Sequence, residues 1–335
     1  MRRALLGAAV FCVLAAAPAY AAERVKMLMD FLWQSSQGGF TLAADRGYYA
    51  AEGLEVAIDH GAGSADTIGK LATGTYDIGF ADVNLLVKFN ADNPATRVKA
   101  FFMVYDTSLA SIVTLTRTGI KTPKDLEGRS IAAPEVDNVR ILFPAFARLA
   151  GFDAAKVRWD SVQGSLRETM LAQGRSDASA SFATTAFLGL TAMGIAPSDI
   201  VILRYIDHGL DLYGSALMAS EKTLAERPQL VAAIARAVTR GIKDALARPE
   251  DAVASIRQRD PLLKPDVELQ RFKMVAEQSM LTEPVRRLGL GAAEPARLAR
   301  TIGFVAEAFK VADPPGPEGI YTDAFLPAKE LRRVD

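Results

Sequence analysis

Residues 47–58, Gly-Tyr-Tyr-Ala-Ala-Glu-Gly-Leu-Glu-Val-Ala-Ile, contain the change from helix to strand on which the fold prediction rests. Apolar residues at helical spacing run from residue 39 to residue 51 and stop before Gly53, and residues 54–58 then have the composition of a short strand. Gly47 and Gly53 bracket the helix end, where a residue with φ above zero turns the chain. This stretch therefore predicts a helix followed directly by a β-strand.

The alternation of strands and helices continues on both sides of this stretch. Further strands are predicted over 25–29, 77–80, 98–105 and 111–116, with a helix over 64–71. From residue 121 the alternation restarts, with helices over 122–126, 139–150 and 166–172 and strands over 130–133, near 157, and over 178–182. A last strand over 216–219 precedes several helices, which we expect to pack on the first unit. The pattern predicts an α/β fold with two mainly parallel sheets flanked by helices.

Composition excludes several classes of protein. The 335 residues contain 39 Lys and Arg against 39 Asp and Glu, and no long basic cluster, so we expect no nucleic-acid partner. One cysteine and two histidines do not provide the ligand sets of zinc, iron–sulfur or haem sites. We therefore expect neither a metal nor any other cofactor.

The first 21 residues have the pattern of a secretory signal peptide. Arg2 and Arg3 precede an apolar run over residues 4–17, and Ala19-Tyr20-Ala21 has the small-residue pattern of a cleavage site. Cleavage after Ala21 would remove Cys12, the one cysteine, so no lipid anchor or disulfide is expected. The sequence predicts a mature protein that begins at Ala22 and is a soluble monomer in the periplasm.

Residues 61–66, Gly-Ala-Gly-Ser-Ala-Asp, follow a predicted strand and open a predicted helix. They resemble the start of a dinucleotide-binding motif, but Asp66 occupies the position of the third glycine. We instead expect Ser64 to cap a helix whose backbone N–H groups can donate to a ligand. The chain contains no Gly-x-Ser-x-Gly, His-Glu-x-x-His or Gly-Lys-Ser/Thr motif, which argues against the corresponding enzymes.

Asp30 is the strongest candidate for a functional residue. It follows an apolar strand, and in open α/β sheets ligands bind at the carboxyl ends of the strands. The stretch 33–40 continues from it with Trp33, amides, hydroxyls and glycines. Polar groups next to an aromatic ring suit an uncharged or weakly charged heterocycle.

Motifs along the chain resemble those of the periplasmic solute-binding proteins of ABC importers. They are Asp30-Phe31, the stretch 47–56, Gly74-x-x-Asp77-Ile78-Gly79, the stretch 124–129 (Lys-Asp-Leu-Glu-Gly-Arg) and Gly174-x-x-Asp177-Ala178. The sequence is most similar to the thiamine-pyrimidine-precursor group, which is close to the nitrate, sulfonate and taurine binders. The resemblance implies the two-lobe periplasmic-binding-protein fold of type II, with the ligand cleft between the lobes. Residues 22–116 and 213–335 would form one lobe, and residues 117–212 the other.

The resemblance places ligand-binding residues in loops at the strand ends of both lobes. The residues expected to bind are Asp30, Trp33, Gln34, Gln37, Ser64, Asp82, Asn84, Glu135, Asp137, Asn138, Phe182, Asp211 and Tyr213. Where pyrimidine binders typically carry Asn and His before the first helix, this chain has Ser36 and Gln37. These loops contain five carboxylates and neither Lys nor Arg, which favours an amino-bearing or neutral aromatic heterocycle over a small anion.

The sequence therefore predicts a binding protein and not an enzyme. It would capture a small, aminopyrimidine-like solute and deliver it to an ABC permease in the inner membrane. One alternative is a binder of sulfonate, taurine or another small organic anion with the same fold. A second is a pyrimidine-synthesising enzyme, but the resemblance implies a cysteine-rich motif and an active-site His that this chain lacks. A third, a cytosolic sensor, disagrees with the predicted signal peptide.

Overall fold

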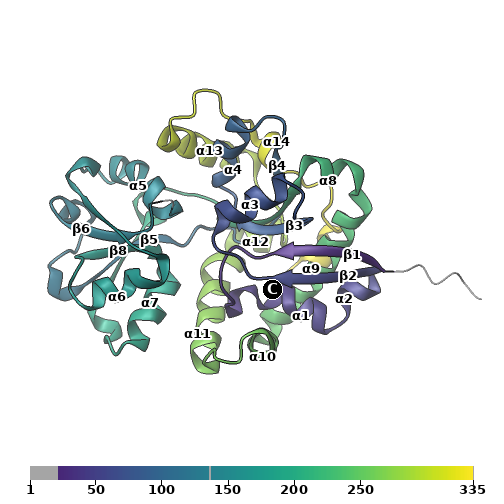
Figure 1. Cartoon of the computed structure of the whole chain (residues 1–335), viewed down its shortest axis with the longest axis horizontal. Helices are drawn as coiled ribbons and strands as arrows, with labels where there is room; N and C mark the ends of the chain where they lie inside the picture. The colour runs from purple at the N-terminus through teal and green to yellow at the C-terminus, as the bar shows by residue number, and fades with distance from the viewer. Residues whose placement is uncertain (1–21, 136, 335) are drawn as a thin grey trace, which may run out of the picture.

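The computed structural model describes residues 22–135 and 137–334. The predicted signal peptide and its cleavage site after Ala21 lie outside the described residues. Two five-stranded sheets lie side by side, each covered by helices (Figure 1). We call each sheet with its helices a lobe, and the expected two-lobe fold is confirmed. No helix between residues 22 and 334, position 136 aside, has the length and hydropathy needed to span a membrane.

The first sheet has the strand order β2-β1-β3-β10-β4. β1 pairs in parallel with β2 and β3, whereas β10 is antiparallel to both β3 and β4. β10 comes from a distant part of the sequence and lies between β3 and β4 in the sheet. Its strands are β1 (Glu23–Leu28), β2 (Leu54–Asp59), β3 (Ile78–Asp82), β4 (Val98–Met103) and β10 (Ser215–Ser220).

The second sheet repeats this pattern, in the order β7-β6-β8-β5-β9. β5 is its antiparallel strand and hydrogen-bonds to β8 and β9. From the sequence this strand was expected in the first lobe, but its hydrogen bonds place it in the second sheet, because the chain passes from one sheet to the other just before it, at residues 104–109. The strands are β5 (Ala110–Leu115), β6 (Ser130–Ala133), β7 (Arg158–Ser161), β8 (Ala178–Phe182) and β9 (Ile200–Arg204).

The two Gly-x-x-Asp motifs have the same structural role in the two sheets. The Asp77 carboxylate accepts a hydrogen bond from Lys26 N at 2.8 Å, and the Asp77 N–H donates to Lys26 O at 3.0 Å. Asp177 makes the same pair of contacts with Ser130, at 2.9 and 3.1 Å. Each aspartate therefore fixes the start of one strand against its parallel neighbour, which explains how these motifs identify the fold.

Most helices pack where the sequence placed them. The predicted helix over 39–51 breaks at Gly47, which has a φ of 69°, into two helices. Against the first sheet lie α1 (Gly38–Asp45), α2 (Tyr48–Ala51), α3 (Ser64–Ala72), α4 (Leu85–Asp92), α8 (Glu221–Glu226), α9 (Pro228–Ala247) and α10 (Pro249–Arg259). Against the second lie α5 (Asn138–Leu149), α6 (Arg167–Ala172) and α7 (Ala183–Ala192).

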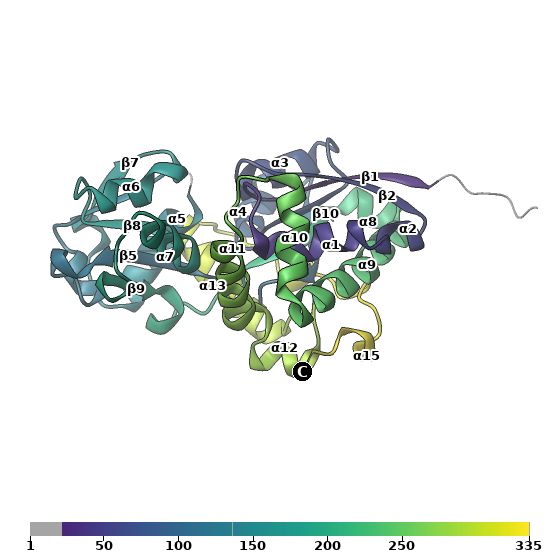
Figure 2. The ribbon, with the colours of Figure 1, turned by 90° about the horizontal axis from the view of Figure 1, so that it is seen from below.

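Two of the late helices contact both lobes, contrary to the expectation that all would pack on the first. α11 (Pro265–Val275) contacts α10 and α7, and α13 (Pro295–Phe309) contacts α4 and α5. Figures 1 and 2 both show α11 between the lobes. The remaining helices of this region are α12 (Glu283–Leu288), α14 (Pro317–Ile320) and α15 (Lys329–Arg332). A buried apolar core continues from α4 through α13 into α5.

Two segments, residues 104–109 and 209–214, connect the lobes, and they lie against each other. Ser108 N donates to Leu212 O and Gly214 N donates to Tyr105 O, both at 2.9 Å. A Cβ atom at Gly214 would lie 2.8 Å from the Tyr105 Cβ, so only glycine allows this approach. We call these two hydrogen-bonded segments the hinge region.

Candidate functional site

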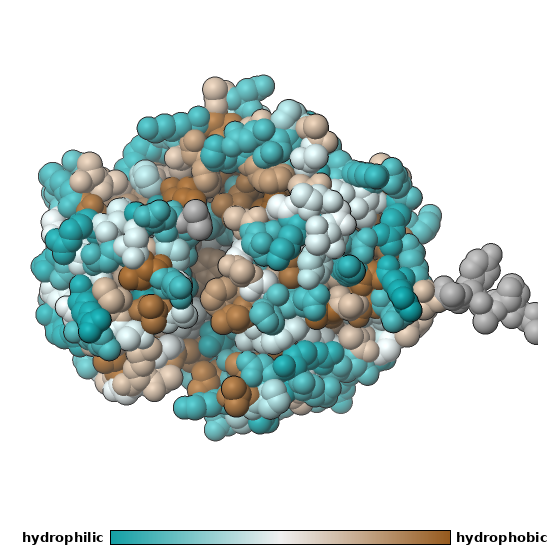
Figure 3. Space-filling view, in the orientation of Figure 1, coloured by the Kyte–Doolittle hydropathy of each residue, from teal (hydrophilic) through white to brown (hydrophobic). Residues whose placement is uncertain are grey.

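A cavity of about 320 Å³ lies between the two lobes. Its opening is a hollow in the surface between the two halves of the molecule (Figure 3). This volume is at the lower end of those typical for sites that bind organic ligands. Eight of the thirteen expected binding residues line it: Asp30, Gln34, Gln37, Ser64, Asp82, Asp137, Asn138 and Phe182.

Asp30 and Gln37 form one wall of the cavity. Asp30 lies just beyond the end of β1, with Met29 between them, and its Oδ1 accepts a hydrogen bond from Gln37 Nε2 at 3.3 Å. The buried Gln37 Oε1 has no hydrogen-bond partner among the described residues. The wall therefore offers two neighbouring groups that accept hydrogen bonds.

Asp82 and Asn138 connect the lobes at the cavity. Asp82 ends β3 in the first lobe, and its Oδ2 accepts a hydrogen bond from Nδ2 of Asn138, which begins α5 in the second lobe. Asp82 Oδ1 accepts from Asn84 N at 2.9 Å and Asn84 Nδ2 at 2.7 Å. Ser64 does not cap α3 as expected. Its Oγ instead accepts from Asp82 N at 3.1 Å, and so it joins α3 to the end of β3.

The carboxyl groups of the cavity are poorly solvated. Burial raises the pKa of Asp30 to about 7, although the Gln37 hydrogen bond lowers it. Burial also raises the pKa of Asp82 to about 6, against hydrogen bonds from Asn84 and Asn138 that lower it. Without a cation beside either group, burial outweighs these hydrogen bonds. A ligand that donates N–H groups would compensate for this burial.

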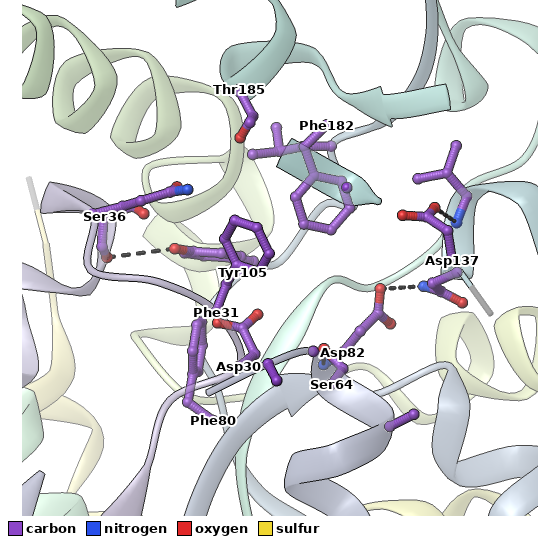
Figure 4. A pocket seen from close by; sticks show the side chains of 18 of the residues that line it. Asp30, Phe31, Ser36, Ser64, Phe80, Asp82, Tyr105, Asp137, Phe182 and Thr185 are labelled. Carbon is purple, nitrogen blue, oxygen red and sulfur yellow. Dashed lines mark hydrogen bonds between the residues drawn. The ribbon is translucent and has the colours of Figure 1, made fainter. Parts of the chain in front are cut away.

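Aromatic rings supply the apolar part of the wall. Phe31, Phe80, Tyr105 and Phe182 line the cavity. Figure 4 shows Phe31, Tyr105 and Phe182 among the side chains around the cavity, together with the Asp30 carboxyl. The Tyr105 hydroxyl donates to Ser36 O at 3.4 Å. Rings and hydrogen-bond acceptors together suit a planar heterocycle.

Arg167 also lines the cavity, although the expected loops contain no basic residue. Its Nη1 donates to Asp137 Oδ2 at 2.9 Å and its Nε to Glu168 Oε1 at 3.0 Å. Asp137 in turn caps α5, since its Oδ1 accepts from Val139 N at 2.8 Å. The Arg167 guanidinium therefore faces two carboxylates, so these three side chains together carry a net negative charge.

Three expected residues lie away from the cavity. Trp33 packs edge-on against His60, with ring centroids 6.0 Å apart. Asn84 lies behind Asp82, where its Nδ2 also donates to Tyr213 O at 2.7 Å. Glu135 is exposed and accepts a hydrogen bond from Ser161 Oγ at 3.2 Å.

Asp211 and Tyr213 also lie away from the cavity, in the hinge region. Asp211 is paired with Arg297 of α13, at 2.6 Å between Oδ1 and Nη2. The Tyr213 ring lies under the same guanidinium, 4.2 Å from its centre. Both side chains therefore contact Arg297 of α13. The sequence did not predict that this helix lies beside them.

Four more lining residues, Phe31, Ser36, Gly63 and Pro134, lie in the same loops as the expected residues. The lining residues not predicted from the sequence are Ala62, Ala65, Asp66, Phe80, Leu85, Tyr105, Leu109, Val139, Gly164, Arg167, Thr184, Thr185 and Val275. Tyr105 ends an apolar run, and the two threonines lie in the first turn of α7, which directly follows β8, so position after a strand could have identified these three. Nothing in the local pattern distinguishes Arg167 or Val275.

The comparisons with known proteins identify the family. The family model described as NMT1/THI5 like matches residues 34–252, which is more than half of the chain. The chain belongs to the NMT1/THI5-like family. The expected resemblance to solute-binding proteins of the thiamine-pyrimidine-precursor group is thereby confirmed.

Two characterised relatives are binding proteins. The riboflavin-binding protein RibY of Chloroflexus aurantiacus is 26% identical over 315 residues, which cover 91% of this chain and 86% of that protein. The formylaminopyrimidine-binding protein of Halalkalibacterium halodurans is 23% identical over 236 residues, which cover 70% of this chain and 69% of that protein. These family members are named for ligands that they bind.

Solved structures support the fold. The alkanesulfonate-binding protein SsuA from Xanthomonas axonopodis pv. citri, bound to MOPS, superposes with a TM-score of 0.66 at 14% identity, covering 91% of this chain and 100% of that one. This likeness confirms the periplasmic-binding-protein fold. Within residues 22–135 and 137–334, no group of three or more His, Cys, Asp or Glu side chains is arranged to hold a metal ion.

Proposed function

We propose that this protein is the extracytoplasmic solute-binding component of an ABC importer. It captures an aromatic heterocycle that donates N–H groups, of aminopyrimidine type, between two closing lobes. It then delivers this ligand to a permease in the inner membrane, and it acts as a monomer in the periplasm without catalysing a reaction. The two relatives named for binding riboflavin and formylaminopyrimidine support a heterocyclic ligand.

This proposal rests on one observation: the same cavity contains both aromatic rings and hydrogen-bond acceptors that lack a donor. Gln37 Oε1 and Asn138 Oδ1 are buried without a partner among the described residues, and they come from different lobes. Asp30 adds a third acceptor beside Tyr105 and Phe182. Buried acceptors are costly unless a donor meets them, so a ligand that donates to both lobes stabilises the closed arrangement.

We also propose that each sheet moves together with its own helices as one lobe. The first lobe would comprise residues 22–103 and 215–334, and the second residues 110–208. The hydrogen-bonding of β5 with β8 and β9 supports this division. The hinge region would then lie at residues 104–109 and 209–214.

Titration calorimetry with aminopyrimidines, riboflavin and aliphatic sulfonates tests the proposal. Asp30→Asn keeps the size of the side chain but removes its charge, so a donating heterocycle should bind about ten- to a hundredfold more weakly. Asp92→Asn is the matched control, because Asp92 is an exposed partner of Lys88 on the same lobe. Tight binding of a sulfonate that Asp30→Asn leaves unchanged would contradict the heterocycle proposal.

One observation favours the alternative of an organic anion, namely the presence of Arg167 in the wall. Its guanidinium is already paired with Asp137 and Glu168. An anion would have to displace a carboxylate from it, and the excess negative charge opposes this. Improved sulfonate binding by Asp137→Asn, together with loss of binding in Arg167→Lys, would favour the anion.

A further inference from the structure

A second cluster of charged groups is buried outside the ligand cavity, at the hinge region. We call it the hinge cluster, and it consists of Asp106, Asp211 and Arg297. The Arg297 side chain is 7% exposed and that of Asp106 is 5% exposed, whereas Asp211 is partly exposed. None of the three lines the cavity. Direct contact with the ligand therefore does not explain these groups.

The Arg297 guanidinium holds one residue of each connecting segment. Nη1 donates to Asp106 Oδ1 at 2.9 Å, in the segment 104–109. Nη2 donates to Asp211 Oδ1 at 2.6 Å, in the segment 209–214, and Nε lies 3.1 Å from both Asp211 oxygens. The planar fork thus uses one nitrogen for Asp106 and two for Asp211, a geometry that lysine cannot reproduce.

Arg297 is itself fixed in α13. Its guanidinium stacks on Tyr213, and the Tyr213 hydroxyl accepts a hydrogen bond from Glu294 N at 2.8 Å, just before α13 begins. At its far end α13 reaches the second lobe, where Glu307 pairs with Arg148 of α5 at 2.7 Å. The cluster therefore joins both connecting segments to a helix that contacts both lobes.

Polar contacts link this cluster to the cavity. Asn84 Nδ2 donates to Asp82 Oδ1 at the cavity and to Tyr213 O in the hinge region, each at 2.7 Å. On the other segment, Thr282 Oγ1 donates to Asp106 Oδ2 at 2.7 Å. Rotation of one lobe against the other changes the φ and ψ angles of the connecting segments. Rotation that separates the segments from α13 must break a charge-assisted hydrogen bond that is shielded from water.

We propose that Arg297 is a positioning residue that clamps both connecting segments to α13 and so limits how far the lobes open without ligand. The clamp keeps the lobes near the arrangement in which Asp82 meets Asn138. A ligand then finds both walls of its site close together. The inference goes beyond the proposed function, because it concerns the ligand-free protein and does not depend on which solute binds.

Arg297→Lys tests the clamp, because it keeps the charge but can no longer hold both acids with one planar group. Arg300→Lys is the matched control, since Arg300 is exposed on the same helix and donates only to Ala296 O. Small-angle scattering of the ligand-free protein should give a larger radius of gyration for Arg297→Lys than for the wild type and Arg300→Lys. Backbone amides of residues 104–109 and 209–214 should exchange hydrogen about tenfold faster in Arg297→Lys alone.

A second variant keeps the test informative if Arg297→Lys folds poorly. Asp211→Asn removes the charge of the more exposed acid, and it should increase the radius and the exchange of segment 209–214 more than that of 104–109. A lower melting temperature with an unchanged radius and unchanged exchange in both variants would overturn the proposal, since a merely structural ion pair gives that result. These readouts need no ligand, so they can succeed or fail independently of the solute that the cavity binds.

Discussion

The ligand cavity and the hinge cluster both contain buried aspartates, but among the described residues Asp30 and Asp82 of the cavity have no cation as a partner, whereas both aspartates of the hinge cluster pair with Arg297. Asp30 and Asp82 in the cavity are held by the side chains of Gln37, Asn84 and Asn138, all of them amides. In the hinge cluster Arg297 meets both carboxylates. Burial raises the pKa of Asp106 as well, but Arg297 opposes this effect. Aspartates that are paired within the protein stabilise its shape, whereas aspartates left without a cation are available to a ligand.

The largest expected effect comes from removing the cation of the hinge cluster. Arg297→Met leaves Asp106 buried and unpaired, so the free energy of unfolding should fall by about 3–5 kcal/mol. Urea denaturation at pH 7 measures this free energy of unfolding. Adding Asp106→Asn to this variant should recover part of the loss, because the orphaned charge is then gone. Arg300→Met should change little, and an equal loss in both single variants would remove the distinction between the two regions.

The next effect concerns Asp30 and has a defined pH dependence. Since burial raises the pKa of Asp30 from 3.8 to about 7, the folded state holds a proton that the unfolded state releases between these values. Asp30 therefore lowers stability progressively as the pH rises from about 4 to 7. Asp30→Asn should be more stable than the wild type above pH 7, by on the order of 1–3 kcal/mol, and nearly equal to it at pH 4.

Urea denaturation of both proteins at pH 4.5 and pH 8 checks this difference, with Asp92→Asn as the control that should show none. If the free energies of unfolding of Asp30→Asn and the wild type differ by the same amount at both pH values, Asp30 is not the group that titrates.

A smaller effect is expected at the contact between the lobes. Asn138→Ala removes the hydrogen bond to Asp82, so the free energy of unfolding should fall by about 1 kcal/mol. The ligand-free radius of gyration should increase, because this contact crosses the cavity. Scattering together with urea denaturation measures both quantities. Unchanged scattering would show that the hinge cluster alone determines the opening.

The smallest effect is expected at Glu135. This residue lies only two positions from Asp137 but outside both the ligand cavity and the hinge cluster. Glu135→Ala removes an exposed hydrogen bond to Ser161, so stability should change by less than about 0.5 kcal/mol. Ligand affinity should stay the same. Calorimetry with any solute that binds the wild type checks this. A tenfold loss would place Glu135 in the site.

Most of the fold could be predicted from local sequence. Glycines at helix ends, such as Gly53, act within their own neighbourhood. Asp77 and Asp177 belong to short Gly-x-x-Asp motifs that can be recognised locally, although their backbone partners lie 51 and 47 residues away. The sheet to which β5 belongs could not be predicted, because an apolar, β-branched strand has the same pattern in either sheet. Its position depends on pairing with β8, which lies more than 60 residues later.

The candidate site could be predicted in part, for a similar reason. Asp30, Asp82 and Asp137 line the cavity because each lies at or just after the end of a strand or at the start of a helix at the sheet edge. Asp211 also lies in a connection between two strands, β9 and β10, but it faces Arg297, which is 86 residues away in sequence. A carboxylate at a strand end is therefore a candidate for ligand binding only when no distant helix supplies its partner, and local sequence does not contain that information.

The strand order of the two sheets also affects the order in which the protein can fold during synthesis. All five strands of the second lobe lie within residues 110–204, so this lobe is a continuous stretch of chain. The first lobe needs β10 (Ser215–Ser220) to join β3 and β4, and until that strand emerges their edges stay unpaired and open to aggregation. β10 begins more than 100 residues after β4 ends, so it emerges late whether the chain leaves a ribosome or a membrane channel. We therefore expect the half of the molecule that contains Asp30 and Asp82 to fold last and to depend most on chaperones.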